Sequence, residues 1–328
     1  MLTDRQNKIL KLIVDDYIQL AKPVGSKLIC NSLKCSSATV RSEMATLEEL
    51  GLLEKTHTSS GRVPSEKGYR YYVDHLMEPK KMSGEAMLNL QTVFNNSKLQ
   101  LSDPIAKSLE IISELTHYTT IALGKASHDN ALKQINIVPL NEEELVAIVI
   151  TDKGYVEHKN MALQGVSLKE IQTTVDLINK MIVGTPMDEI SKKLEFEVKP
   201  IIAKYVSQHE RIYQAFYDVF KDFMDQNINI VGKNNLLNQP EFNSVDKIRD
   251  IFTKLDDKNI IDSIEEDNNN INIYIGKENH FDDDVTIIKT KYSTPYEEGT
   301  LAIIGPKRME YDKVVALLEY IKNQIGSE

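Results

Sequence analysis

Hydrophobic residues at the start of the chain repeat at helical spacing in three successive runs. The first run follows a capping box made by Thr3 and Gln6, and its predicted buried stripe is Ile9, Leu10, Ile13, Val14 and Tyr17. The motif PVGS at 23–26 introduces a shorter helix that ends near Leu33. A third helix, from about Ala38 to Leu50, has the stripe Val40, Met44, Leu47 and Leu50. The pattern therefore predicts three consecutive helices.

The opposite face of the third predicted helix carries small side chains near its N-terminal end, namely Ala38, Ser42, Ala45 and Thr46. Such a face lets the helix backbone approach a partner surface closely. Ser36 and Ser37 can cap this helix and offer hydroxyl and amide groups to a phosphate. Gly51 is placed to end it. These features are typical of a helix that enters a DNA groove.

A polar hairpin follows this helix. Leu52–His57 is predicted as a strand, Thr58–Gly61 as a tight turn and Arg62–Pro64 as a short return strand. Ser65 then opens a fourth helix, with the stripe Tyr69, Tyr72, Val73 and Leu76. Three helices followed by a wing is the order of a winged helix-turn-helix DNA-binding domain. A structural corner of an α+β domain would give the same hairpin pattern.

The rest of the chain alternates between strand-rich and helix-rich segments after a polar break at Glu78–Gly84. Strands are predicted on both sides of a helical block, at 119–123, 135–138, 145–151, 155–159, 271–275, 285–291 and 300–304. We therefore expect a multidomain α+β fold. It consists of a winged-helix domain at 1–78, a mixed α/β domain built from 85–160 and 235–328, and an inserted helical domain at 161–234.

The segment Lys199–Phe223 could form one long helix within this insert. Its apolar stripe is rich in aromatic residues and consists of Ile202, Val206, Tyr213, Phe216, Phe220 and Phe223. Such a stripe could be ordinary core. We favour a dimerisation surface, because Tyr and Phe are enriched in interface cores and a DNA reader needs a twofold partner.

Composition excludes several classes of protein. The 328 residues contain 41% hydrophobic and 27% charged residues, without a membrane-length apolar run or a signal-peptide pattern. A cytoplasmic protein is the expectation. Cys30 and Cys35 are too few for a disulfide framework, and their spacing fits no zinc site. We expect no metal and no cofactor.

Charge is distributed unevenly, which matters for the DNA hypothesis. The whole chain carries −10, whereas residues 1–78 hold 11 basic and 10 acidic residues and the segment 22–70 has a local net charge of +3. One copy should bind DNA weakly, so a homodimer is expected. The predicted DNA-contacting residues are Ser36, Ser37, Thr39, Arg41, Ser42, Thr46, Lys55, Ser60, Arg62 and Lys67.

An enzyme is not expected. The sequence has no nucleophile elbow, phosphate-binding loop or metal signature. A regulator whose α/β domain binds a small molecule remains an alternative, because the sequence does not distinguish a ligand-gated repressor from one without a ligand.

Two blocks of the sequence resemble one known family, the heat-inducible transcription repressors called HrcA. The first block contains VDDYI, PVGSK, SSATVRSEM, LEELGLLEK and HTSSGRVPSEKGYRYYVDHL, between residues 14 and 76. The second contains IGKEN at 275–279 and IIGPKRMEYDKVV at 303–315. The resemblance implies a winged-helix DNA-binding domain, a GAF-like domain and a dimerising helical insert. It also implies repression of heat-shock chaperone operons through an inverted repeat called CIRCE, with the GroE chaperonin keeping the repressor active.

Overall fold

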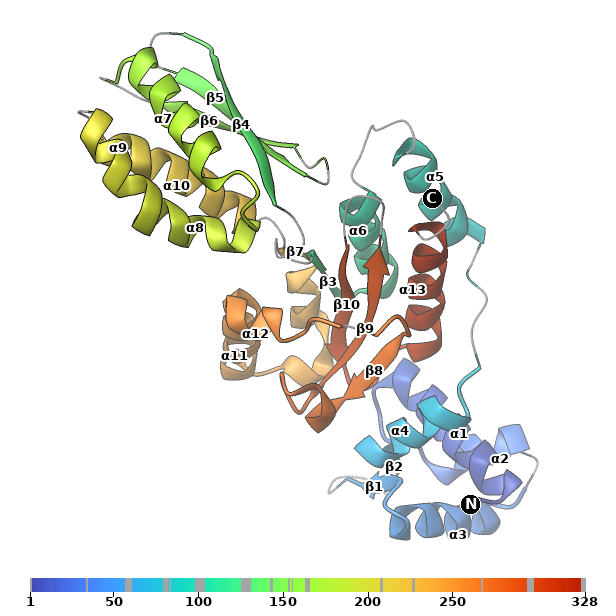
Figure 1. Cartoon of the computed structure of the whole chain (residues 1–328). Coiled ribbons are helices and arrows are strands. Elements are labelled where there is room, and N and C mark those ends of the chain that lie inside the picture. The colour runs from blue at the N-terminus through green and yellow to red at the C-terminus, as the bar shows by residue number, and fades with distance from the viewer. Residues whose placement is uncertain are drawn as a thin grey trace. The chain divides into compact units, whose positions relative to one another are not determined.

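The computed structural model begins with four helices and a two-stranded wing (Figure 1). Their bounds are α1 Asp4–Leu20, α2 Ser26–Leu33, α3 Ser37–Glu49, β1 Leu53–Lys55, β2 Arg62–Pro64 and α4 Glu66–His75. The winged-helix order predicted from the sequence is confirmed. The capping box is present, since the Thr3 hydroxyl accepts the Gln6 N–H at 3.3 Å and the Gln6 side chain accepts the Thr3 N–H at 2.9 Å.

The chain forms two compact units. The first consists of Met1–Ala122, Ile230–Tyr292 and Thr300–Glu328, and the second of Leu123–Asn229 and Ser293–Gly299. The structure describes residues 2–33, 35–56, 61–78, 82, 84–97, 104–124, 131–141, 144–152, 154, 156–162, 166–206, 209–225, 228–266, 268–293 and 298–325. Among the helices of these residues, none is long and apolar enough to span a membrane.

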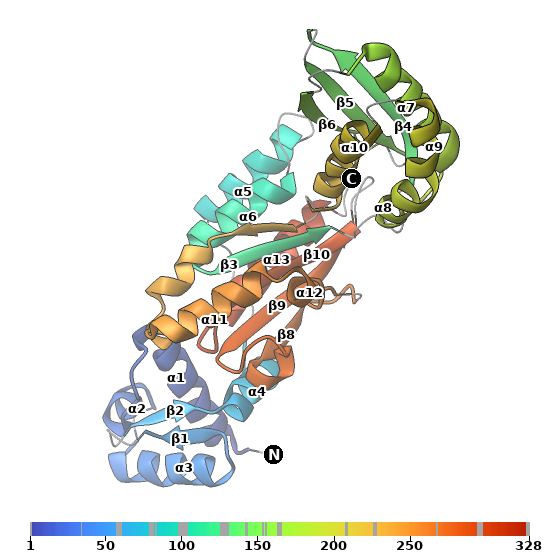
Figure 2. The same ribbon diagram turned by 90° about the vertical axis from the view of Figure 1, so that its left-hand side faces the viewer.

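A five-stranded sheet forms the centre of the first unit, with the strand order β7-β3-β10-β9-β8. The strands are β3 Thr119–Gly124, β7 Ile228–Val231, β8 Asn272–Ile275, β9 Val285–Ser293 and β10 Glu298–Pro306. The helices around it are α5 Gly84–Ser97, α6 Pro104–Thr116, α11 Val245–Asp256, α12 Lys258–Asp262 and α13 Tyr311–Ile325. Figures 1 and 2 show α13 and α6 on one side of this sheet and α11 and α12 on the other.

Burial along the central strands agrees with this two-sided cover. Ile288 of β9 and Ile303 of β10 belong to the hydrophobic core that includes α6 and α13. Their neighbours Ile287 and Ile304, which point to the opposite face, are 2% and 0% exposed. A strand buried on both faces reads as a continuous apolar run, as in the sequence of Leu301–Ile304.

The second unit contains its own sheet, which corrects the predicted domain limits. Strands β4 Leu132–Pro139, β5 Glu144–Thr151 and β6 Val156–Ala162 pair antiparallel with one another in the order β4-β5-β6. The sequence had assigned these strands to the interrupted α/β domain. Hydrophobic alternation identifies a strand but not its partner, and here each strand pairs with its neighbour in the chain. The inserted segment therefore begins at Leu123 rather than at residue 161.

Helices cover one face of this three-stranded sheet. They are α7 Leu168–Ile182, α8 Ile190–Lys193, α9 Lys199–Tyr205 and α10 His209–Asp225, with a π-helical segment Leu194–Val198 between α8 and α9. The predicted single helix over 199–223 is wrong. It breaks at Val206, whose backbone is extended with φ −129° and ψ 123°.

The aromatic stripe of this segment lies inside the second unit. Five of its side chains are between 0% and 6% exposed and share one core with the three-stranded sheet and α7. They are Ile202, Val206, Tyr213, Phe216 and Phe220. Phe223 is part of α10, but its side chain lies outside the described residues. A surface for a second copy must be accessible in the single chain. The prediction that these five residues form the dimer surface is therefore corrected, and they are core.

Candidate nucleic-acid interface

Helix α3 presents an exposed face of small side chains. Its apolar residues Val40 and Leu47 are fully buried. On the opposite side Ala38, Ser42 and Ala45 are exposed, at the spacing that lines one helix face. No bulky side chain from this stripe would hold the α3 backbone away from a groove floor. This face is therefore the candidate surface for reading DNA bases.

Hydrogen bonds at the start of α3 fix the polar groups there. The Ser36 hydroxyl caps the helix by accepting the Thr39 N–H at 3.1 Å, and it lies 2.9 Å from the Thr39 hydroxyl. The hydroxyl of Ser26 on α2 contacts two further side chains. It lies 3.0 Å from the Ser37 hydroxyl, and it accepts a hydrogen bond from Arg41 Nε at 3.3 Å. The structure brings these predicted residues together with Ser26, a residue that the sequence analysis did not single out.

The remaining predicted groups on α3 lie further along the helix. Thr46 is half-buried, and its hydroxyl donates to the Ser42 carbonyl at 3.2 Å. Arg41 is exposed beside the small-residue face. Its guanidinium has donors beyond Nε, so both a phosphate and a guanine edge remain chemically available to it.

The wing is anchored by a single β-bridge that the sequence analysis did not predict. Val24, between α1 and α2, exchanges two backbone hydrogen bonds with Arg62, of 2.9 and 3.0 Å. Gly61 lies so close to Pro23 that a Cβ there would come within 2.8 Å of the proline ring. The motifs PVG at 23–25 and GRV at 61–63 therefore contact each other. This contact fixes the base of the wing beside α2.

Arg62, one of the predicted DNA-contacting residues, forms an ion pair within the winged-helix domain. Its Nε and Nη2 lie 2.7 and 2.6 Å from Glu48 Oε2, and its side chain is 16% exposed. The charge of Arg62 is therefore balanced by Glu48 of α3, and the pair ties the wing to α3, the candidate recognition helix. A guanidinium held in this way contributes less to phosphate attraction than an exposed one.

Exposed cations lie on the elements next to α3. Lys55 lies on β1, and Lys67 of α4 donates to the Leu50 carbonyl at the end of α3 at 2.9 Å. Lys22 and Lys27 flank the Val24 segment and are exposed as well. The last two were missed, although both lie in the stretch of locally positive charge. Ser60, at the predicted wing tip, lies outside the described residues.

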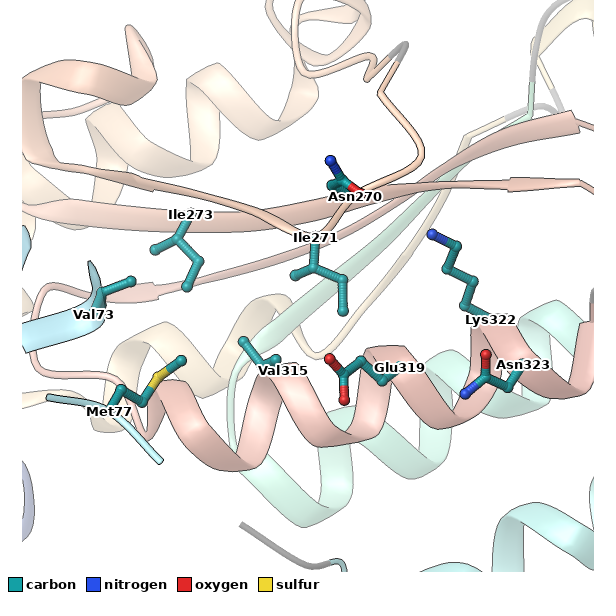
Figure 3. Close-up of a pocket in the computed structure, with 9 residues that line it drawn as sticks. All are labelled: Val73, Met77, Asn270, Ile271, Ile273, Val315, Glu319, Lys322 and Asn323. Atoms are coloured by element: carbon teal, nitrogen blue, oxygen red, sulfur yellow. The ribbon is translucent and has the colours of Figure 1, made fainter. Parts of the chain in front are cut away.

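A cavity of about 620 Å³ lies in the first unit, next to α4 (Figure 3). One end is apolar and is lined by Val73, Met77, Ile271, Ile273 and Val315. The other end carries the amide and charged groups of Asn270, Glu319, Lys322 and Asn323. Its volume is within the range of small-molecule sites, which is about 300–1,000 Å³.

Comparisons with known proteins identify both parts of the chain. Residues 1–75 match the model of the HrcA winged helix-turn-helix DNA-binding domain, and residues 102–315 match the model of the HrcA C-terminal domain. The chain is 39% identical to the heat-inducible transcription repressor HrcA of Bacillus pumilus strain SAFR-032, over all of this chain and 98% of that protein. It also shares the fold of a crystal structure described as a hypothetical protein. That structure matches with a TM-score of 0.71 and 22% identity over all of this chain and 98% of the other.

Proposed function

The chain belongs to the HrcA family of heat-inducible transcription repressors, and we propose that it binds a CIRCE-type inverted repeat as a homodimer. It is a transcription repressor with a winged-helix DNA-binding domain, not an enzyme. The observation that carries the proposal is the small-residue face of α3, with a fixed wing beside it. One winged-helix domain, which we call a head, reads one half-site. An inverted repeat has two half-sites and therefore needs two heads.

The charge of the head also favours a pair. If Lys22, Lys27, Arg41 and Lys55 each meet one phosphate, a dimer neutralises about eight phosphates and log affinity falls against log salt with a slope of about −7. A single head would give a slope of about half that value. Measuring operator affinity between 50 and 200 mM salt tests this. A slope of about −3.5 or shallower for the intact protein contradicts the proposal.

The outer face of the three-stranded sheet supports a homodimer in place of the aromatic stripe. On β5 this face carries Val146, Ile148 and Ile150, which are only partly buried. The cross-strand partners Val138 and Val156 are 46% and 58% exposed. The other cross-strand neighbours on this face are polar, namely Gln134 and Asn136 of β4 and His158 and Asn160 of β6. A partly exposed apolar strip along β5 with polar groups beside it is typical of a surface that a partner covers. We place the contact between copies there.

Maturation by the GroE chaperonin is the second part of the proposal, and the topology supports it. Strand β3 and its sheet neighbours β7 and β10 are separated in the chain by the whole second unit. Such long-range pairing is slow and exposes apolar strands on the way. Heat would fill the chaperonin with other unfolded proteins and leave less active repressor, so the chaperone genes would be expressed.

Refolding tests the chaperonin step. Operator binding is measured at fixed total concentration after refolding with chaperonin, without it, and with chaperonin plus an unfolded competitor. The proposal expects higher recovery with chaperonin and a loss of that gain with competitor. Full spontaneous recovery at the growth temperature, unchanged by the competitor, contradicts it and favours a dimer that is itself sensitive to heat.

The cavity beside α4 favours a second candidate, a repressor gated by a small amphipathic molecule. Its apolar end and its Glu319–Asn323 end could hold the two parts of such a ligand. Native mass spectrometry of the purified protein tests this directly. A bound metabolite whose removal changes operator affinity supports gating, whereas protein of the bare chain mass with full affinity contradicts it.

A further inference from the structure

The C-terminal motifs at 275–279 and 303–315 are not part of the DNA-reading surface. They lie instead where the body of the first unit, meaning the five-stranded sheet and the helices around it, packs against helices α1 and α4 of the winged-helix domain within the same unit. Figures 1 and 2 both show α4 next to the β8 end of the sheet. We call this region the joint. It is made of three separate contacts.

The first contact of the joint pairs α4 with the turn Gly276–Asn279. Arg70 Nε donates to Glu278 Oε1 at 3.1 Å, and Arg70 Nη2 donates both to Glu278 Oε2 and to the Ile273 carbonyl. Burial alone would raise the pKa of Glu278. The hydrogen bonds from Arg70 and from the Ile275 N–H outweigh burial and lower the pKa, so the carboxylate is charged at neutral pH.

Glu66 adds a backbone contact to the same turn. Its carboxylate accepts the Lys277 N–H at 3.0 Å. Gly276 has a φ of +54°, and a Cβ there would lie 1.6 Å from Glu66 Oε1. A side chain at position 276 would strain the backbone and displace the Glu66 carboxylate from the Lys277 N–H. The glycine of the IGKEN motif therefore leaves room for this contact of the joint.

The second contact is aromatic and lies at the centre of the joint. Tyr311, at the start of α13, is fully buried. Its ring lies 6.0 Å from that of Tyr69 and 6.4 Å from that of Tyr72. The Tyr72 hydroxyl in turn donates to Asp15 of α1 at 2.7 Å. Aromatic side chains from both sides thus form one packed layer.

The third contact uses Arg308 of the second motif. Its Nη1 donates to the Ile18 carbonyl near the end of α1 at 3.2 Å. The same guanidinium pairs with Glu241, and its Nη2 donates to Gln239 at 3.1 Å. Glu241 and Gln239 therefore fix the Arg308 side chain, and Arg308 in turn binds the end of α1.

We infer that Arg70 and Glu278 are positioning residues, which fix the angle of the recognition helix so that the two heads of a dimer match the half-site spacing. Three contacts on two different helices oppose rotation, whereas one contact would leave a hinge. The inference rests on the proposed function, because spacing matters only for a dimer on a repeat. A head that rotates keeps its contacts to one half-site, but the effective concentration of the second head falls.

The test compares the full-length protein with Arg70→Gln and Glu278→Lys. The matched control is Asp74→Asn, which removes the neighbouring partner of Arg70 on α4 at 3.3 Å and keeps the link to the body. Affinity is measured for the inverted repeat, for a single half-site, and for repeats whose spacer is changed by 2 and 5 base pairs. The two joint variants change net charge in opposite directions, so a shared loss cannot come from attraction to DNA.

The inference expects both joint variants to keep half-site affinity and to lose about tenfold on the full repeat, with a weaker preference among spacers. The control should match the wild type. An equal loss on half-site and full repeat overturns the inference and assigns the pair to folding of the head. Wild-type behaviour in both variants also overturns it. If the wild-type protein itself shows no spacer preference, the proposed dimer on a repeat fails.

Discussion

Replacing Gly68 by alanine should destabilise the winged-helix domain, although helix propensity predicts the opposite. Gly68 is inside α4, where alanine is favoured over glycine by about 1 kcal/mol. However, a Cβ at position 68 would lie 2.0 Å from the Leu52 carbonyl oxygen. This oxygen belongs to the backbone at the base of the wing and accepts the Ser65 N–H at 3.2 Å, so it cannot move without breaking that bond.

The expected net cost is about 1–3 kcal/mol, the usual range for added atoms in a packed site. Urea unfolding measures it, with Gly25→Ala as the control, because a Cβ at position 25 has nothing within 4 Å. The control should lie within about 0.5 kcal/mol of the wild type. Operator affinity should fall in the Gly68 variant as the wing shifts. Equal stability of the Gly68 variant and the wild type would refute the reasoning.

Three further changes test other parts of the account. Substituting Ser42 should change the preference among operator variants by about 1–3 kcal/mol, whereas Lys55→Ala should weaken binding to all sequences alike, as competition binding would show. Ile148→Asp should give monomers in sedimentation velocity with an unchanged circular dichroism spectrum; a stable dimer would exclude this sheet face. Tyr69→Phe removes a buried hydroxyl that has no hydrogen-bond partner among the described residues. Thermal unfolding should therefore show equal or higher stability, and a loss above about 1 kcal/mol would reveal a partner.

The winged-helix domain was predictable because its signals are local. A capping box at Thr3, a helix-ending glycine at position 51 and stripes at helical spacing each depend on residues a few positions apart. The bridge between Val24 and Arg62 was not predictable in this way, because a single paired residue has no periodicity. The ion pair between Arg62 and Glu48 was not predictable either, because Glu48 is 14 positions away and lies on another element.

The inserted unit shows the second limit of the sequence. An alternating strand pattern at 145–151 is the same whether the strand joins one sheet or another. The aromatic stripe has the same helical spacing in a core as at an interface. Burial decides between these cases, and Phe216 and Phe220 are 1% and 0% exposed within the single chain. The break at Val206 also escaped the pattern, because the apolar spacing continues across it.

The number of chains on one inverted repeat tests the central claim most directly. Sedimentation of the repressor with a labelled repeat, taken from the site that it protects upstream of a chaperone operon, gives this number. Two chains per duplex, with much weaker binding to an isolated half-site, are the expected result. One chain per duplex with the same affinity for the half-site and the whole repeat would contradict the account.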